Sequence, residues 1–250
     1  SRSYRSRALL ADPEYFENPL GKILDQKYLD RLVSSISSYK TLKLDPLDEK
    51  DYIPQESTET THLSILDKNG NAVSMTVTLN GSFGSGIFTE KYGINLNNEM
   101  DDFSSKKGVP NAYGLVGFEA NEIKAQKRPL SSMTPTIVFK NQKPYLVLGS
   151  PGGSRIITTV LQVVINVLEH DMNIKQAVIS PRIHHQWLPD VLLMEEGFSS
   201  DTIDLLKEKG HTIRPSRTMG SVQAIISKDN YLYGAADPRR PEAGAVVVSP

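Results

Sequence analysis

The sequence contains no cysteine among its 250 residues. This excludes disulfide bonds, thiolate catalysis and cysteine-ligated zinc, although it does not fix the compartment, because many exported bacterial proteins also lack cysteine. Neither charge is in excess, since 28 Lys and Arg face 29 Asp and Glu, which argues against a nucleic-acid groove as the main surface. No apolar run approaches the roughly 18 residues of a membrane-spanning helix. The N-terminal SRSYRSRALL also lacks the apolar core of a signal peptide.

The residues that are present suit a folded chain with a sizeable core, because 38% are hydrophobic and 23% are charged. Apolar spacing predicts helices over 23–39, 155–169 and 200–209, the last with Ser199 as N-cap and Gly210 at its end. The charged, proline-containing segment 40–59 reads as a linker or exposed loop. Strand patterns dominate from Thr60 to about residue 150, and short strands are expected at 222–226, 231–235 and 245–248. The sequence therefore predicts a mixed, layered α/β fold.

A β-hairpin is the strongest local pattern, with Asn-Gly at 69–70 between two β-prone runs. A two-residue loop would place polar residues opposite apolar ones throughout. A three-residue loop instead pairs Thr60 with Thr78 and Leu63 with Met75, which makes both faces consistent. We expect this second register, with one face apolar and packed. The other face is a row of hydroxyls that ends at Thr60 and Thr78, and the pattern alone favours a solvated sheet face for it.

Several further segments could carry chemistry, and each has a plain structural alternative. The strand-to-helix turn 149-GSPGGSR-155 can aim backbone N–H groups at an anion or an oxyanion, or can be simply a tight turn that needs glycine. The serine pair 131–132 lies in a proline-flanked loop, where a turn is the commoner explanation. Asp101 and Asp102 resemble a solvated strand end. His184 and His185 would point to opposite faces of a strand and so cannot chelate one metal ion.

Taken in order, these motifs resemble gamma-glutamyltransferase (gamma-glutamyltranspeptidase), a family of N-terminal-nucleophile hydrolases. The resemblance covers residues 60–240 and is weaker over 12–59. It implies part of a four-layer αββα sandwich, with 1–59 as the end of the large subunit and 60–250 as the small catalytic subunit. The motifs that carry it are TTHLSILDKNGNAVSMTVTLN, FGSGI, LNNEMDDFS, GVPNAYGLVG, KRPLSSMTPTIV, GSPGGSRIITTVLQ, PRIHHQWLPD and GAADPR.

The resemblance implies that Thr60 is the nucleophile, released by self-cleavage between Glu59 and Thr60. The new α-amine, with an ordinary pKa of about 7.7–8.0, would act as general base. Thr78 matches the residue that hydrogen-bonds the nucleophile, and Gly152 and Gly153 match the oxyanion hole. The substrate-binding residues that the resemblance implies are Asp102 for the α-ammonium, Ser131 and Ser132 for the α-carboxylate, Asn80 and Glu99 beside them, and Tyr113 in a lid loop.

The function implied is gamma-glutamyl transfer or hydrolysis on glutathione and other gamma-glutamyl amides. Water, an amino acid or a dipeptide would accept the acyl group, with no cofactor, metal or nucleic acid, in the periplasm or outside a bacterial cell. The alternatives are a related acylase, a polyglutamate capsule depolymerase or an inactive fragment. Family members carry several hundred residues before the cut, including an arginine for the α-carboxylate. We therefore expect a missing large-subunit portion to be a partner, and slow or absent cleavage without it.

Overall fold

The computed structural model describes residues 1–42 and 60–248. Its contacts divide the described chain into two compact units, each built from separate stretches of sequence. The first unit consists of residues 1–42, 99–131 and 184–216, and the second consists of residues 60–98, 132–183 and 217–248. The predicted loop over 40–59 lies almost wholly outside the described residues, as does Glu59.

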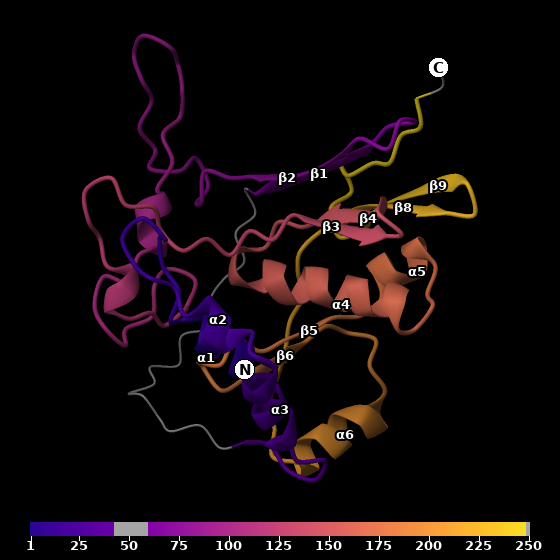
Figure 1. Ribbon diagram of the computed structural model, residues 1–250, viewed down its shortest axis with the longest axis horizontal. Helices are drawn as coiled ribbons and strands as arrows, with labels where there is room; N and C mark the ends of the chain where they lie inside the picture. Colours follow the sequence, from indigo (N-terminus) through magenta and orange to yellow (C-terminus); the bar gives the residue numbers. More distant parts are fainter. Residues whose placement is uncertain (43–59, 249–250) are drawn as a thin grey trace. The chain divides into compact units, whose positions relative to one another are not determined.

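The second unit stacks a hairpin on a sheet, and the sheet on two helices (Figure 1). The sheet is antiparallel, with strand order β3-β4-β8-β9. Its strands are β3 (Thr136–Lys140), β4 (Lys143–Gly149), β8 (Gln223–Lys228) and β9 (Tyr231–Ala236). The hairpin strands are β1 (Thr61–Leu66) and β2 (Ala72–Val77), and the helices are α4 (Ile156–Leu168) and α5 (Ile174–Ile179). The predicted mixed α/β class is confirmed.

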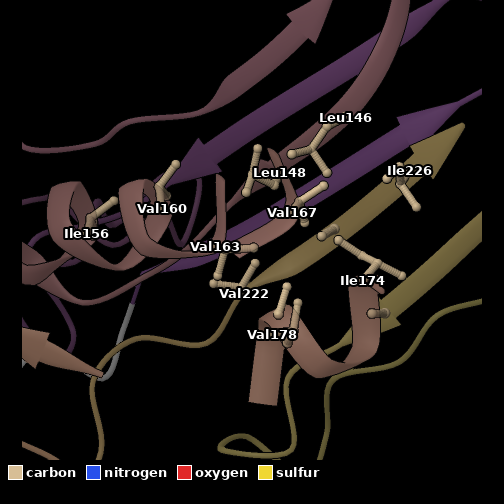
Figure 2. Packing of buried hydrophobic residues seen from close by; sticks show 13 residues of the cluster. Leu146, Leu148, Ile156, Val160, Val163, Val167, Ile174, Val178, Val222 and Ile226 are labelled. Carbon is tan, nitrogen blue, oxygen red and sulfur yellow. The ribbon is translucent and has the colours of Figure 1, made fainter. Parts of the chain in front are cut away.

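The core of this unit lies between the sheet and α4, as Figure 2 shows. Buried residues of α4 recur at intervals of three and four, which places them on one helical stripe against the sheet. They are Ile156, Val160, Val163 and Val167. Leu146 and Leu148 of β4 are two residues apart on one strand, so they lie on the same face of the sheet. Both belong to the core cluster with this stripe. The predicted helix over 155–169 is confirmed, with a 3₁₀ turn at Gly153–Arg155 just before α4.

The predicted hairpin register is confirmed, since Thr61 pairs with Val77 and Leu63 with Met75. The predicted faces are wrong. The apolar face is the open one, with Leu63 and Met75 each about 45% exposed, whereas the hydroxyl face packs against the sheet and is buried or half-buried. The reason is hydrogen bonding: Ser74 Oγ donates to the carbonyl of Leu148 at 2.8 Å and Ser64 Oγ to that of Gln223 at 2.9 Å.

The first unit is made of short helices, irregular segments and a small sheet in the order β5-β6-β7. The strands are β5 (Ile183–His184), β6 (Leu192–Met194) and β7 (Ile213–Pro215). The helices are α1 (Arg2–Arg7), α2 (Leu20–Ile23), α3 (Gln26–Ser34) and α6 (Ser200–Glu208), with 3₁₀ turns at Glu99–Asp102 and Glu119–Asn121. The α6 prediction is confirmed, because Ser199 caps it by accepting from the Thr202 amide, and Gly210 follows with φ +95°.

The helix predicted over 23–39 is wrong in its bounds. It begins at Gln26 because the Asp25 side chain accepts from the Tyr28 amide and caps it. It ends at Ser34, where the serine-rich sequence offers the backbone competing hydrogen bonds, such as that from the Tyr39 amide to Ser37 Oγ.

Two strand expectations also fail. Residues 81–135 contain isolated bridges in place of the expected strands. Residues 245–248 form no strand, and the side chains of Val246, Val247 and Val248 are 83–87% exposed. β-Branched residues favour a pleated surface only where a neighbouring strand completes it.

Candidate active site

Thr60 lies at the open end of the hairpin, immediately before the first residue of β1. Its side-chain hydroxyl donates a hydrogen bond to Thr78 Oγ at 3.0 Å, and the residue is only 3% exposed. The amide of Asn80 donates to the same Thr78 oxygen at 2.8 Å. With both donors in place, the Thr78 oxygen fixes the direction of the Thr60 O–H bond, so the lone pairs of Thr60 Oγ point elsewhere. A buried hydroxyl oriented in this way is suited to nucleophilic attack.

Asn80 follows the end of β2 in a left-handed conformation, with φ +74°. Asparagine tolerates this region better than most residues. Its side-chain Nδ2 donates to the carbonyl of Asn98 at 3.1 Å, and the side chain is buried. The bend therefore fixes Asn80 beside the hydroxyl pair, and its place in the substrate pocket stays a prediction.

The glycine-rich turn connects β4 to α4 within the same unit. Gly152 and Gly153 have φ values of +134° and +56°, which other residues rarely adopt. Gly153 opens the 3₁₀ turn that continues into α4, so the positive end of the helix dipole lies close by. The turn is fixed from outside by Ser150, whose hydroxyl accepts from the Ser221 amide at 2.9 Å.

The turn is on the same side of the hairpin as the Thr60 hydroxyl. Thr60 and His62 are two residues apart and so share a face. The backbone of Gly149 at the start of the turn packs directly on the His62 ring, since an added Cβ there would lie 2.2–2.7 Å from the ring atoms. The turn is therefore not on the far side of the hairpin, which would have ruled out an oxyanion-hole role. Where the N–H groups of Gly152 and Gly153 point stays a prediction.

His62 is a site neighbour that the sequence analysis did not single out. Its Nδ1 contacts Thr76 Oγ at 2.8 Å and its Nε2 contacts Ser64 Oγ at 3.0 Å. Burial lowers the pKa of the ring to about 4. The imidazole is therefore neutral at pH 7; it connects two hydroxyls of the hairpin, and its ring packs against Gly149 of β4.

The ion cluster around Asp237 is a second feature that the sequence did not predict. Its carboxylate accepts from Arg182 at 2.6 Å and from Arg239 at 3.1 Å, and it also accepts from the Val222 amide. Arg182 and Asp237 are each about 1% exposed. Arg182 and Arg239 lower the pKa of the Asp237 carboxyl, against the raising effect of its burial. The motifs around residues 182 and 237 therefore act together to lock the segment after β9.

In the first unit, the structure places a pair of carboxyl groups at the 3₁₀ turn Glu99–Asp102. Asp102 is 9% exposed and hydrogen-bonds Glu99, whereas the adjacent Asp101 is exposed. Burial, with a further contribution from the nearby Glu99, raises the pKa of Asp102 to about 7 against the lowering effect of Arg7. Burial also raises the pKa of Glu99. Two carboxyls that share a site in this way favour a state with one proton between them. Asp102 is thus not a solvated strand end.

Arg7 is the clearest residue of this unit to which the sequence assigned no role. Its guanidinium donates to the backbone carbonyls of Leu130 at 3.1 Å and Ser131 at 2.9 Å. Burial lowers the pKa of Arg7, and Tyr4 and Asp102 oppose that shift. Arg7 therefore fixes the loop that carries the serine pair and adds positive charge near the carboxyl pair.

The remaining predicted residues are placed as follows. Ser131 is exposed and ends the first unit, and Ser132 begins the second, where its carbonyl accepts from the Thr134 hydroxyl at 2.9 Å. Tyr113 is half-buried in a tight turn, in which its amide donates to Asn111 Oδ1 at 3.0 Å. A lid role for Tyr113 stays a prediction.

The two adjacent histidines have separate partners. His184 is buried and contacts Gln186 at 2.9 Å, while His185 contacts Asp190 at 2.9 Å. Over the ranges 1–42 and 60–248, no cluster of three or more His, Asp or Glu residues could hold a metal ion. None of the helices in those ranges has the length and hydropathy needed to cross a membrane.

Comparison with known proteins gives the family. A sequence model described as gamma-glutamyltranspeptidase matches residues 1–247. The glutathione hydrolase proenzyme of Escherichia coli strain K12 is 50% identical over 231 residues, which cover 92% of this chain and 40% of that protein. The chain thus spans well under half the length of this relative.

Solved structures agree. A threonine-to-alanine mutant of the Helicobacter pylori gamma-glutamyltranspeptidase is 56% identical with a TM-score of 0.70, covering 72% of this chain and 100% of that chain. The Bacillus anthracis transpeptidase CapD is 25% identical with a TM-score of 0.58, covering 75% of this chain and 99% of that chain. Since the family model covers nearly every residue, and the higher identities all point the same way, the chain belongs to the gamma-glutamyltranspeptidase family.

Proposed function

We propose that this chain supplies the catalytic part of an enzyme that transfers or hydrolyses gamma-glutamyl groups, with glutathione among its donors. The observation that carries the proposal is the buried contact between the hydroxyls of Thr60 and Thr78 at 3.0 Å. A threonine hydroxyl is a weak nucleophile unless it is oriented and has a base close by. The contact orients it, and a free α-amine on Thr60 would be the base.

The chemistry proceeds in two acyl transfers. The Thr60 oxygen attacks the γ-carbonyl carbon of the donor while its proton passes to the α-amine of Thr60. The tetrahedral oxyanion is stabilised by the amides of Gly152 and Gly153. Collapse breaks the C–N bond, the leaving amine takes the proton, and an ester on Thr60 remains. Water, an amino acid or a dipeptide then attacks the ester and regenerates the hydroxyl.

Recognition of the donor falls to its α-amino acid end. Asp102 accepts the α-ammonium and the hydroxyls of Ser131 and Ser132 bind the α-carboxylate, with Asn80 and Glu99 beside them. The raised pKa of Asp102, about 7, is compatible with this role, because the positive charge of a bound α-ammonium favours the ionised carboxylate, and the shared proton is then released to solvent. Tyr113 belongs to the lid loop of this arrangement.

The α-amine arises by self-cleavage between Glu59 and Thr60, which separates residues 1–59 from 60–250. In the complete protein the large-subunit portion would be a partner of this chain, and the location we propose is the periplasm or outside a bacterial cell. The exposed apolar face of the hairpin, which includes Leu63 and Met75, supports such a partner, because large contiguous apolar patches are rarely exposed on a monomeric protein.

The test uses the full-length protein that contains this sequence, with a chromogenic gamma-glutamyl anilide as donor and intact mass as the readout of cleavage. Thr60→Ala is expected to abolish both cleavage and turnover, and Thr60→Ser, which keeps the hydroxyl, to retain part of both. Cleavage or turnover that persists in Thr60→Ala would refute the assignment of the nucleophile.

A second candidate within the same fold is a related acylase or a polyglutamate capsule depolymerase. The structural likeness to the CapD transpeptidase favours it, although at 25% identity against 56% for the gamma-glutamyltranspeptidase. Poly-gamma-glutamate and a cephalosporin amide, assayed beside the anilide, separate these donors. A full-length protein that is not cleaved and turns over none of these donors would indicate that the chain is an inactive fragment.

A further inference from the structure

Arg240 makes a contact to the nucleophile that no motif of the sequence indicated. Its Nη1 donates a hydrogen bond to the backbone carbonyl of Thr60 at 2.7 Å, across 180 residues of sequence. Both residues belong to the second unit, and Arg240 is half-buried. The bond is charge-assisted and short, which places it in the stronger class of protein hydrogen bonds.

The segment that carries Arg240 is itself firmly held. Three residues earlier, the buried carboxylate of Asp237 is paired with Arg182 and Arg239. The turn then closes with hydrogen bonds from the Arg240 amide to the Asp237 carbonyl, and from the Ala243 amide to the Arg240 carbonyl. The guanidinium therefore starts from a fixed backbone, so its contact with Thr60 loses less side-chain entropy than one made from a mobile tail.

The position of Thr60 explains why it needs an anchor. The ladder of the hairpin begins at Thr61, so Thr60 lies outside the paired residues. The proposed cleavage would make Thr60 a chain terminus, and termini are poorly ordered unless they are tied down. Two hydrogen bonds then hold the residue, because its hydroxyl is bound to Thr78 and its carbonyl to Arg240.

We propose that Arg240 is a positioning residue that keeps Thr60 in its attacking geometry once the chain is cut. Fixing both the hydroxyl and the carbonyl oxygen of one residue fixes its Cα, and hence the direction of its α-amine toward Oγ. Arg240 bonds the main chain of Thr60 and acts on the substrate only through it. The inference rests on the proposed function of Thr60 and adds a residue to that machinery.

The expected kinetic effect falls on the acyl-transfer step. If the hydrogen bond from the charged Arg240 stabilises the transition state for acyl transfer, its loss raises the activation free energy. The expected result is about a tenfold to hundredfold fall in kcat. KM for the donor should change by less than about threefold, because the residues proposed to bind the donor are untouched. Arg240→Lys should recover much of the loss, since an ammonium can also donate to the Thr60 carbonyl.

The experiment compares Arg240→Met, Arg240→Gln and Arg240→Lys with Arg217→Met in the full-length protein. Arg217 is an exposed arginine of the same unit and serves as the matched control. The measurements are kcat and KM with the gamma-glutamyl anilide, the rate of cleavage by intact mass, and the thermal midpoint. Slower cleavage that lysine restores is also an expected result, because the same hydroxyl attacks in both steps.

Several outcomes would overturn the inference. They are an unchanged kcat and cleavage rate in Arg240→Met and Arg240→Gln, a rise in KM alone, or a loss that follows the thermal midpoint and is not restored by lysine. Failure of the proposed function is distinguished by Thr60→Ala: if that variant stays active, Thr60 is not the nucleophile. If Thr60→Ala is inactive and the Arg240 variants are normal, only the role of Arg240 is lost.

Discussion

Replacement of Gly149 by alanine tests the contact between the hairpin and the glycine-rich turn. The Cβ of alanine would lie 2.2 Å from Cε1, 2.4 Å from Nδ1 and 2.7 Å from Nε2 of the His62 ring. Real contacts of a Cβ are almost never shorter than 3.0 Å, so the ring must move. Gly149 lies in β4 and has no left-handed φ, so alanine causes no backbone strain of its own there. The whole effect should come from His62.

The cost follows from what holds that ring. It is 6% exposed and bound on both nitrogens, to Thr76 and to Ser64. Overpacking costs about 1–3 kcal/mol, and each lost hydrogen bond about 0.5–1.5 kcal/mol. We expect Gly149→Ala to lower the free energy of unfolding by about 2–6 kcal/mol. Because His62 shares its face with Thr60, turnover should fall as well.

Urea unfolding followed by circular dichroism measures the effect, in a double-mutant cycle with His62→Ala. Removal of the ring leaves space for the methyl group, so Gly149→Ala should cost less than about 1 kcal/mol in that background. Gly244→Ala is the matched control, since nothing lies within 4 Å of a Cβ there. Equal costs of Gly149→Ala with and without the His62 ring would refute the reasoning.

Two pH-dependent predictions follow from the buried titratable groups. The pKa of His62 is about 4 in the folded protein, below its unfolded value. Stability should therefore fall as the pH drops from about 6.5 through 4, by about 1–2 kcal/mol after allowance for solvent screening, and His62→Gln should flatten the profile in urea titrations. The pKa of Asp102 is raised to about 7, so its ionisation costs stability as the pH rises from about 4 through 7. Asp102→Asn should thus be more stable than the parent at pH 8, by about 2–4 kcal/mol, with the gain vanishing near pH 4, while KM for gamma-glutamyl donors rises about tenfold or more. A variant that is less stable at pH 8, or whose KM is unchanged, would contradict the assignment of Asp102.

Local sequence was sufficient for the elements whose signals are local. The Asn-Gly dipeptide and the alternation on either side of it determined the hairpin register, because a slip by one residue would mix polar and apolar side chains on both faces. The N-cap at Ser199 and the glycine at 210 bounded α6 for a similar reason, since capping involves only neighbouring residues. The motif order likewise indicated the family that the comparisons show.

Only the tertiary structure determined which face of each layer is covered and which distant residues meet. The hydroxyl face of the hairpin packs against the sheet because its side chains hydrogen-bond the carbonyls of Leu148 and Gln223, whereas alternation alone does not determine which face a second sheet will cover. The same holds for Arg240, whose partner Thr60 is 180 residues away. The pairing of Arg182 with Asp237 also joins distant positions, 55 residues apart. Alternation, caps and turns act over a few residues, whereas burial and buried charge pairs depend on contacts between distant segments that form only when the layers assemble.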